Sequence, residues 1–255
     1  MRLLKKVKIA LVFATLVGVH TSAAAQPEAK ASETSVEATG QLIDEGVAAL
    51  ISKDYKRASE IFGYLAQQGI AFDVYNFGLM YANGRGVRQD WVRATALYRM
   101  AAEEGVVEAQ HDLGVAYLEG TGIPKDPVAA VTWFHMAAES GYAPSHYRLG
   151  VAYASGTGVA QDYKMAAFFY SLAANQRYRE AQFMLSLLYA KGEGVPQSLV
   201  TALKWIDLSL AGVEPTSIDF EEARNLRDLI AKQMTPAQIA EAERLAGEWK
   251  KEQTP

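Results

Sequence analysis

A period of 36 residues runs through most of this chain, and it constrains the fold more than any other feature. A tyrosine and two glycines mark the period in every copy. They are Tyr81, Tyr117, Tyr153 and Tyr189; Gly84, Gly120, Gly156 and Gly192; and Gly86, Gly122, Gly158 and Gly194. The four copies contain no insertion or deletion relative to one another. A repeat of this length is typical of elongated arrays in which each unit packs only against its neighbours.

Each copy predicts two helices joined by a loop. In the second copy, small and apolar residues at helical spacing predict one helix within 109–120 and another within 127–141. Asp126 followed by Pro127 favours a helix start, because the carboxylate accepts bonds from unpaired N–H groups and proline suits the first helical position. The other copies place Asp90, Asp162 and Ser198 at this capping position.

The glycine-rich loop between the two helices has three candidate interpretations: a phosphate-binding loop, a calcium loop or a structural turn. The four loops read NGRGVRQD, EGTGIPKD, SGTGVAQD and KGEGVPQS. They lack the Lys-Ser/Thr pair of a phosphate-binding loop and the alternating acidic ligands of a calcium loop. We therefore expect a structural turn with left-handed glycines, where Gly120→Val or Gly156→Val would cost more than ~1 kcal/mol.

The repeated pattern resembles the Sel-like repeat (SLR) family, a relative of the tetratricopeptide repeat. The second copy carries the pattern almost whole, in Ala109, Leu113, Gly114, Tyr117, Gly120, Gly122, Ile123, Asp126, Ala130, Trp133, Phe134, Ala137, Ala138 and Gly141. The resemblance covers residues 71–212. It implies an all-α fold, an α/α solenoid (superhelix) of antiparallel helix pairs.

The segments beside the repeats are expected to close the two ends of the stack. Residues 39–70 lack the G-x-G insertion and resemble a plain tetratricopeptide unit. In the fourth copy, Ser186 replaces a glycine, as terminal repeats are often atypical. Residues 213–255 predict two further helices, the second beginning at a capping box around Thr235, and we expect them to form a C-terminal helical cap.

The N-terminus predicts export. Residues 1–25 combine four basic residues, an apolar run and small residues before Gln26, which is typical of a cleaved signal peptide. Residues 26–38 are almost free of apolar side chains and predict a disordered linker. The chain has 25 Lys+Arg against 29 Asp+Glu, and the signal would remove four of the basic residues. We expect a periplasmic or secreted acidic protein that neither inserts into a membrane nor binds nucleic acid.

The resemblance to tetratricopeptide repeats implies that the first helix of each pair lines a concave groove. Counted from Ala71, the fifth, ninth and last-turn positions would face it. They are Tyr75, His111, Tyr147 and Phe183; Leu79, Val115, Val151 and Leu187; and Asn83, Glu119, Ser155 and Lys191. The rings at the fifth position could instead pack in the core, and the pattern leaves both roles open.

Motifs for chemistry are scarce in this sequence. It has no cysteine, and His111 and His146 lack further ligands at metal spacing, so we expect no metal or cofactor. The resembled family includes adaptors that regulate envelope sensors or meet host proteins. We therefore expect a non-catalytic scaffold for a protein or peptide partner. The alternative is a cell-wall hydrolase or small-ligand binder that uses the carboxylates Glu108, Asp112, Glu119 and Glu180.

Overall fold

The computed structural model describes residues 26–211 and 218–252, in which every regular element is an α-helix. The helices are α2 (Gln26–Ile51), α3 (Tyr55–Gln67), α4 (Ala71–Asn83), α5 (Trp91–Glu103), α6 (Val107–Glu119), α7 (Pro127–Glu139), α8 (Ala143–Ser155), α9 (Tyr163–Asn175), α10 (Arg179–Lys191), α11 (Leu199–Leu210), α12 (Ile218–Ala231) and α13 (Pro236–Glu252). The predicted signal peptide, residues 1–25, lies outside the described residues.

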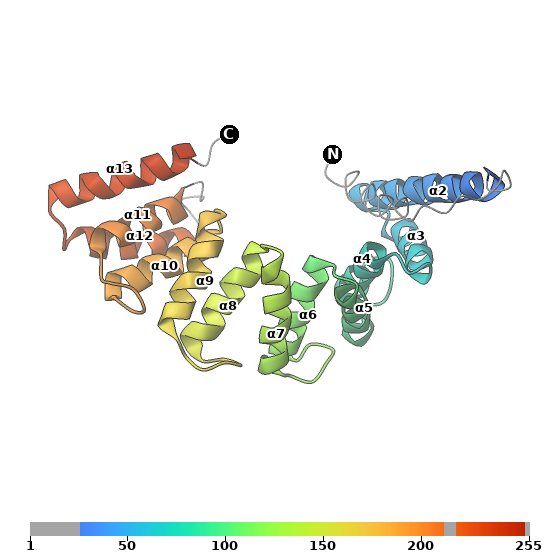
Figure 1. Cartoon of the computed structure of the whole chain (residues 1–255), viewed down its shortest axis with the longest axis horizontal. Coiled ribbons are helices and arrows are strands. Elements are labelled where there is room, and N and C mark those ends of the chain that lie inside the picture. The colour runs from blue at the N-terminus through green and yellow to red at the C-terminus, as the bar shows by residue number, and fades with distance from the viewer. Residues whose placement is uncertain (1–25, 212–217, 253–255) are drawn as a thin grey trace.

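The helices stack as a solenoid of hairpins, as the sequence predicts. In each repeat a first helix (α4, α6, α8 or α10) packs along a second helix (α5, α7, α9 or α11), and α5, α7 and α9 also pack against the next first helix. Figure 1 shows that the stack curves into an open arch with α2 at one end and α13 at the other. Buried alanines such as Ala94, Ala130 and Ala166 let neighbouring helices approach closely within this core.

The helix boundaries follow the predicted capping chemistry. The Asp126 carboxylate accepts hydrogen bonds from the backbone N–H groups of Val128 and Ala129, both at 3.0 Å. Asp90, Asp162 and Ser198 cap the other second helices in the same way. At the opposite end of the loop, Gly120 follows α6 with φ of 79°, a left-handed conformation that glycine adopts without a Cβ clash. The interpretation of the loop as a structural turn is confirmed.

The second glycine of each loop packs against the backbone of the preceding repeat. A Cβ built on Gly122 would lie 2.2 Å from the backbone oxygen of Trp91, at the start of α5. The Thr95 hydroxyl of that same helix donates to the Gly122 carbonyl oxygen at 3.3 Å. Only a residue without a side chain fits so close to another backbone, so this glycine sets the contact between repeats.

A third recurrent glycine brings the two helices of a hairpin together. A Cβ on Gly114 would lie 2.7 Å from the Phe134 ring. The fourth repeat has Ser186 at this position, and there the facing residue is Ile206 instead of an aromatic ring. Both side chains are fully buried. The smaller aliphatic partner makes room for the serine, so the two departures from the pattern compensate for each other.

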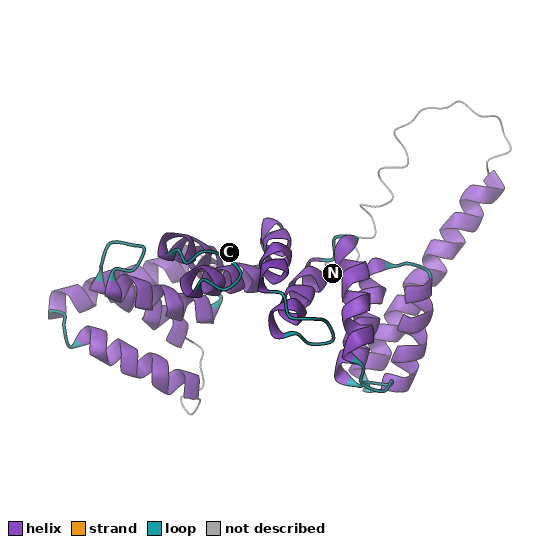
Figure 2. Ribbon diagram, turned by 90° about the horizontal axis from the view of Figure 1, so that it is seen from below, coloured by secondary structure: helices purple, strands orange, loops and turns teal. Residues whose placement is uncertain are grey.

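The structure corrects the prediction for residues 26–38. They form the first half of helix α2, not a disordered linker (Figure 2). The second half of α2 packs with α3 as a helix pair. Low hydrophobicity does not prevent a helix, and the alanines and glutamates of this segment are strong helix formers.

The C-terminal helices cover the last repeat. Ala223 and Ile230 of α12 and Ala242 of α13 belong to one apolar cluster with α11. Trp249 of α13 packs against Trp205 with ring centroids 5.9 Å apart. The predicted capping box is present, because the Thr235 N–H donates to Gln238 and the Gln238 N–H donates to the Thr235 hydroxyl.

Candidate binding groove

The predicted groove residues form a stripe along α4, α6, α8 and α10, which we call the groove face. Their exposure rises along each helix. The fifth position is buried in Tyr75 and half-buried in the other three repeats, the ninth is half-buried throughout, and the last-turn position is exposed in all four. Side chains at the C-terminal end of each helix are therefore the most accessible to a partner.

Three of the four rings at the fifth position pack against a ring on the second helix of their own repeat. Tyr75 lies 5.6 Å from Tyr98, and Tyr147 lies 5.9 Å from Tyr170, measured between ring centroids. His111 lies 5.6 Å from Phe134 in the same relation. Such tilted ring pairs add stability beyond the area that they bury. Each of these three rings thus helps to hold its hairpin together.

The same rings also reach the next repeat. The Tyr75 hydroxyl donates to the Asp112 carboxylate at 2.8 Å, and Tyr147 packs against Tyr178 with centroids 5.3 Å apart. Tyr75 is 9% exposed and its hydroxyl is engaged, so little of it remains for a ligand. Burial is the largest cause that raises the pKa of Tyr75. A binding role for the rings stays a prediction, but it suits Tyr147 and Phe183 better than Tyr75.

His111 is held neutral within this packing. Burial, with a smaller contribution from Arg148, lowers its pKa to about 4. Its Nδ1 lies 2.8 Å from the Ser145 hydroxyl, whereas His146 stacks on Phe169 with centroids 6.3 Å apart. The two histidines therefore engage different partners. Among residues 26–211 and 218–252, no group of three or more His, Asp or Glu could hold a metal ion.

The last-turn positions present mostly polar groups. Asn83 and Ser155 bond to carbonyl oxygens of their own helices, those of Leu79 and Val151, at 2.8 and 2.9 Å. Lys191 lies 3.9 Å from Glu193. Exposed pairs of this kind stabilise the fold little, so these groups are available to exchange partners.

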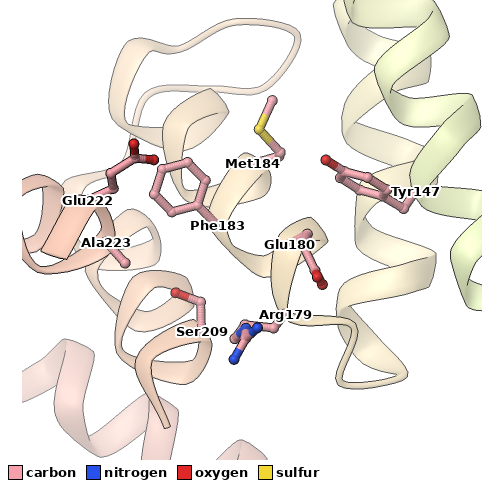
Figure 3. Close-up of a pocket in the computed structure, with 8 residues that line it drawn as sticks. All are labelled: Tyr147, Arg179, Glu180, Phe183, Met184, Ser209, Glu222 and Ala223. Atoms are coloured by element: carbon pink, nitrogen blue, oxygen red, sulfur yellow. The ribbon is translucent and has the colours of Figure 1, made fainter. Parts of the chain in front are cut away.

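A pocket of about 210 Å³ opens on the groove face where four helices meet, and we call it the groove pocket. Its lining residues are Tyr147 from α8; Arg179, Glu180, Phe183 and Met184 from α10; Ser209 from α11; and Glu222 and Ala223 from α12. Figure 3 shows Tyr147 and Phe183 on opposite sides, with the charged groups of Arg179, Glu180 and Glu222 around them. The arrangement is an apolar hollow with charges of both signs at its edge.

The pocket unites two residues that the sequence predicts, Tyr147 and Phe183, and adds residues that it does not. Met184 occupies the sixth position of its helix, one step from the predicted stripe. The carboxyl-bearing Glu222 and the small Ala223 come from α12, beyond the last repeat. Met184 could have been found from its helical spacing, but no sequence signal links α12 to the groove.

The four carboxylates proposed for the alternative hydrolase differ in their burial and in whether they line the groove pocket. Asp112 is half-buried, its Oδ2 accepts the Tyr75 hydroxyl, and burial raises its pKa. Glu108 is half-buried one turn earlier on α6, whereas Glu119 and Glu180 are exposed. Of these four carboxylates, Glu180 alone lines the groove pocket, where the other carboxylate is Glu222 of α12. General acid–base catalysis needs two carboxylates directed at one substrate, and the pocket does not combine two of these four.

Known proteins resemble the chain in sequence and in fold. The Sel1 repeat model matches residues 74–106, 107–142, 143–178 and 179–210. A protective antigen of uropathogenic Escherichia coli with an SLR fold, c5321, is 28% identical with a TM-score of 0.67. A Sel1 repeat protein from Oxalobacter formigenes is 26% identical with a TM-score of 0.63. No curated protein sequence matches the chain.

The alignments differ in how much of each protein they cover. The match to the antigen covers 85% of this chain but 55% of the antigen, so the chain spans little more than half of that protein. The match to the Oxalobacter protein covers 76% of this chain and 86% of the other. Within the described residues, no helix combines the length and the hydropathy of a membrane span. The four matched repeats take up more than half of the sequence, and the chain belongs to the Sel1 repeat family.

Proposed function

We propose that this protein is a non-catalytic scaffold of the bacterial envelope, periplasmic or secreted, which holds a protein or peptide partner on its groove face. Sel1 repeat proteins are generally protein–protein interaction scaffolds. The observation that carries the proposal for this chain is the groove pocket, which two predicted groove residues, Tyr147 and Phe183, both line.

The size and lining of the groove pocket suit a single side chain of a partner. Its volume of about 210 Å³ is below the roughly 300 Å³ at which cofactor and small-molecule sites usually begin. Tyr147, Phe183 and Met184 offer aromatic and thioether surface, which is typical of anchoring pockets in protein interfaces. We expect an apolar side chain of the partner to insert there, with polar contacts to the last-turn residues along the groove.

Export is part of the proposal and rests on the sequence alone. The basic start, apolar run and small residues before Gln26 support cleavage after Ala25. N-terminal sequencing of the protein from fractionated cells tests this directly. A chain that begins at Gln26 in the periplasm or medium is expected, and an uncleaved chain in the cytoplasm would refute export.

The groove assignment is tested by filling the pocket without removing the rings that hold the fold. Ala223 is 6% exposed and lines the pocket, so Ala223→Met places extra volume in it. The exposed Ala240 on α13 provides a matched control as Ala240→Met. Each variant would carry a photo-crosslinking residue at the exposed Ser155, and crosslinked partners would be compared in living cells.

We expect the pocket variant to lose at least about tenfold of the crosslinked product, and the control to retain it. Because Ala223 also belongs to the apolar cluster of α11, α12 and α13, the melting temperatures of both variants, followed by circular dichroism, verify that this packing persists. A Tyr75→Ala variant would be a poor probe, since that ring is buried and bonded to Asp112. If crosslinking at Ser155 survives Ala223→Met in full, the pocket is not where the partner binds.

A further inference from the structure

A second pocket, of about 340 Å³, lies between the α9–α10 turn and α13, and we call it the basic pocket. Three cationic side chains line it: Arg177, Arg179 and Lys250. Among the described residues, no Asp or Glu lines it. The sequence as a whole has a net charge of −4, so three positive groups around one pocket are a local departure from the charge of the chain, and Arg177 and Lys250 also take part in other interactions.

Both arginines stand where the other repeats have small or apolar residues. Arg177 has φ of 65°, and the equivalent residues Gly69, Gly105 and Gly141 also have positive φ. A residue with a side chain is strained in this conformation, whereas glycine adopts it freely. The turn itself therefore does not require an arginine.

Arg179 shows the same departure two residues further on. It is the first residue of α10, and Ala71, Val107 and Ala143 begin the other first helices. Its guanidinium makes none of the hydrogen bonds or ion pairs found among residues 26–211 and 218–252. The charge on Arg179 thus has no structural partner in that part of the chain.

The floor of the basic pocket strengthens its attraction for an anion. Trp249 and Leu208 line it with exposures of 8% and 4%. The buried Gln182 also lines it, and the Gln182 amide donates to the Ala174 carbonyl oxygen at 3.1 Å. Coulomb attraction grows as apolar groups replace water, so a carboxylate against this floor would bind the cations more strongly than in open solvent.

Arg179 lines the groove pocket as well as the basic pocket, so the two hollows adjoin. We propose that the basic pocket receives an acidic side chain of the partner, next to an apolar side chain held in the groove pocket. This inference rests on the proposed function and specifies the chemistry of the partner. It predicts a bound peptide in which an apolar residue and an Asp or Glu lie close together in sequence.

Peptide display on the purified full-length chain tests the inference without knowledge of the natural partner. We expect selected peptides to share an apolar residue close to an acidic one. In the tightest peptide, replacing the acidic residue by its amide should weaken binding about tenfold or more, measured by calorimetry. Selected peptides without an acidic residue, or an amide version that binds equally well, would overturn the basic pocket and leave the scaffold intact.

Two variants assign the effect to the pocket. Arg179→Ala copies the residue that begins α4 and α8, and Arg177→Gly copies the other turns, so both should fold. Each should reduce the preference for the acidic peptide over its amide by several fold, while Arg88→Ala on the exposed first loop should not change it. An undiminished preference in both variants refutes the site. If no peptide is selected at all, the scaffold proposal itself fails.

Discussion

Asp73 offers the sharpest test of the packing described above. Its carboxylate is 1% exposed on α4, and neither oxygen has a hydrogen-bond partner of normal geometry. Burial raises its pKa from 3.8 to about 6, and the nearby Asn76 side chain opposes that rise only in part. Ala109 and Ala181 occupy the equivalent positions and are also fully buried. Asp73→Ala therefore replaces a destabilising charge by the residue that two other repeats use.

The pKa shift sets the magnitude of the effect. A rise from 3.8 to about 6 corresponds to about 3 kcal/mol at 1.36 kcal/mol per pKa unit. Because the folded pKa lies above the unfolded one, the carboxyl imposes no such cost below pH 3.8. As the pH rises from 3.8 through about 6, the free energy of unfolding of the parent protein decreases relative to that of Asp73→Ala. Near neutral pH the full cost is present.

Urea unfolding at about pH 8 and about pH 4 measures this directly. We expect Asp73→Ala to gain free energy of unfolding relative to the parent at the higher pH. The gain should fall by about 2 to 3 kcal/mol at the lower pH. Asp44→Asn, an exposed change on α2, serves as the control and should show no such difference. An equal effect of Asp73→Ala at both pH values would mean that the carboxylate is solvated or paired, and would refute the reasoning.

Three further predictions concern backbone and buried polar groups. Gly120→Ala and Gly122→Ala both impose positive φ on alanine, but only the Cβ at position 122 would lie 2.2 Å from the Trp91 backbone. In thermal unfolding, Gly122→Ala should therefore lose about 2 kcal/mol or more of unfolding free energy beyond the loss in Gly120→Ala. Arg177→Gly should be more stable than Arg177→Ala by about 1 kcal/mol in urea unfolding, and equal stabilities would contradict a strained turn. Ser186 buries a hydroxyl without a partner, so Ser186→Ala should raise the melting temperature, and a decrease would reveal a hidden bond.

Much of the fold follows from local chemistry that a sequence displays. Asp126 caps α7 and Gly120 ends α6 because hydrogen-bond acceptors and left-handed glycines act within a few residues of their position. Because the 36-residue period repeats the same caps and turns, the structure of one unit predicts the structure of the next. For residues 26–38, low hydrophobicity led to the prediction of a disordered linker. Hydrophobicity indicates whether a segment can be buried, whereas the formation of helix α2 depends on the helix propensity of its residues.

The candidate site was only half predictable. Helical spacing identifies Tyr147 and Phe183 as neighbours on one face, and both line the groove pocket. Spacing alone does not distinguish them from Tyr75, whose ring is covered by its own repeat and whose hydroxyl is bound by the next one. That difference depends on the side chains that surround each ring, which vary between copies.

The sequence by itself determined a four-fold array of capped helix pairs, because caps, turns and periodicity are properties of neighbouring residues. Only the tertiary structure decided which faces stay open. It brings α12 to the groove beside α8 and α10, sets Lys250 of α13 in the pocket that Arg177 lines, and buries Asp73 without a partner. Exposure and charge at a point in space depend on segments distant along the chain, and those meet only when the solenoid is assembled.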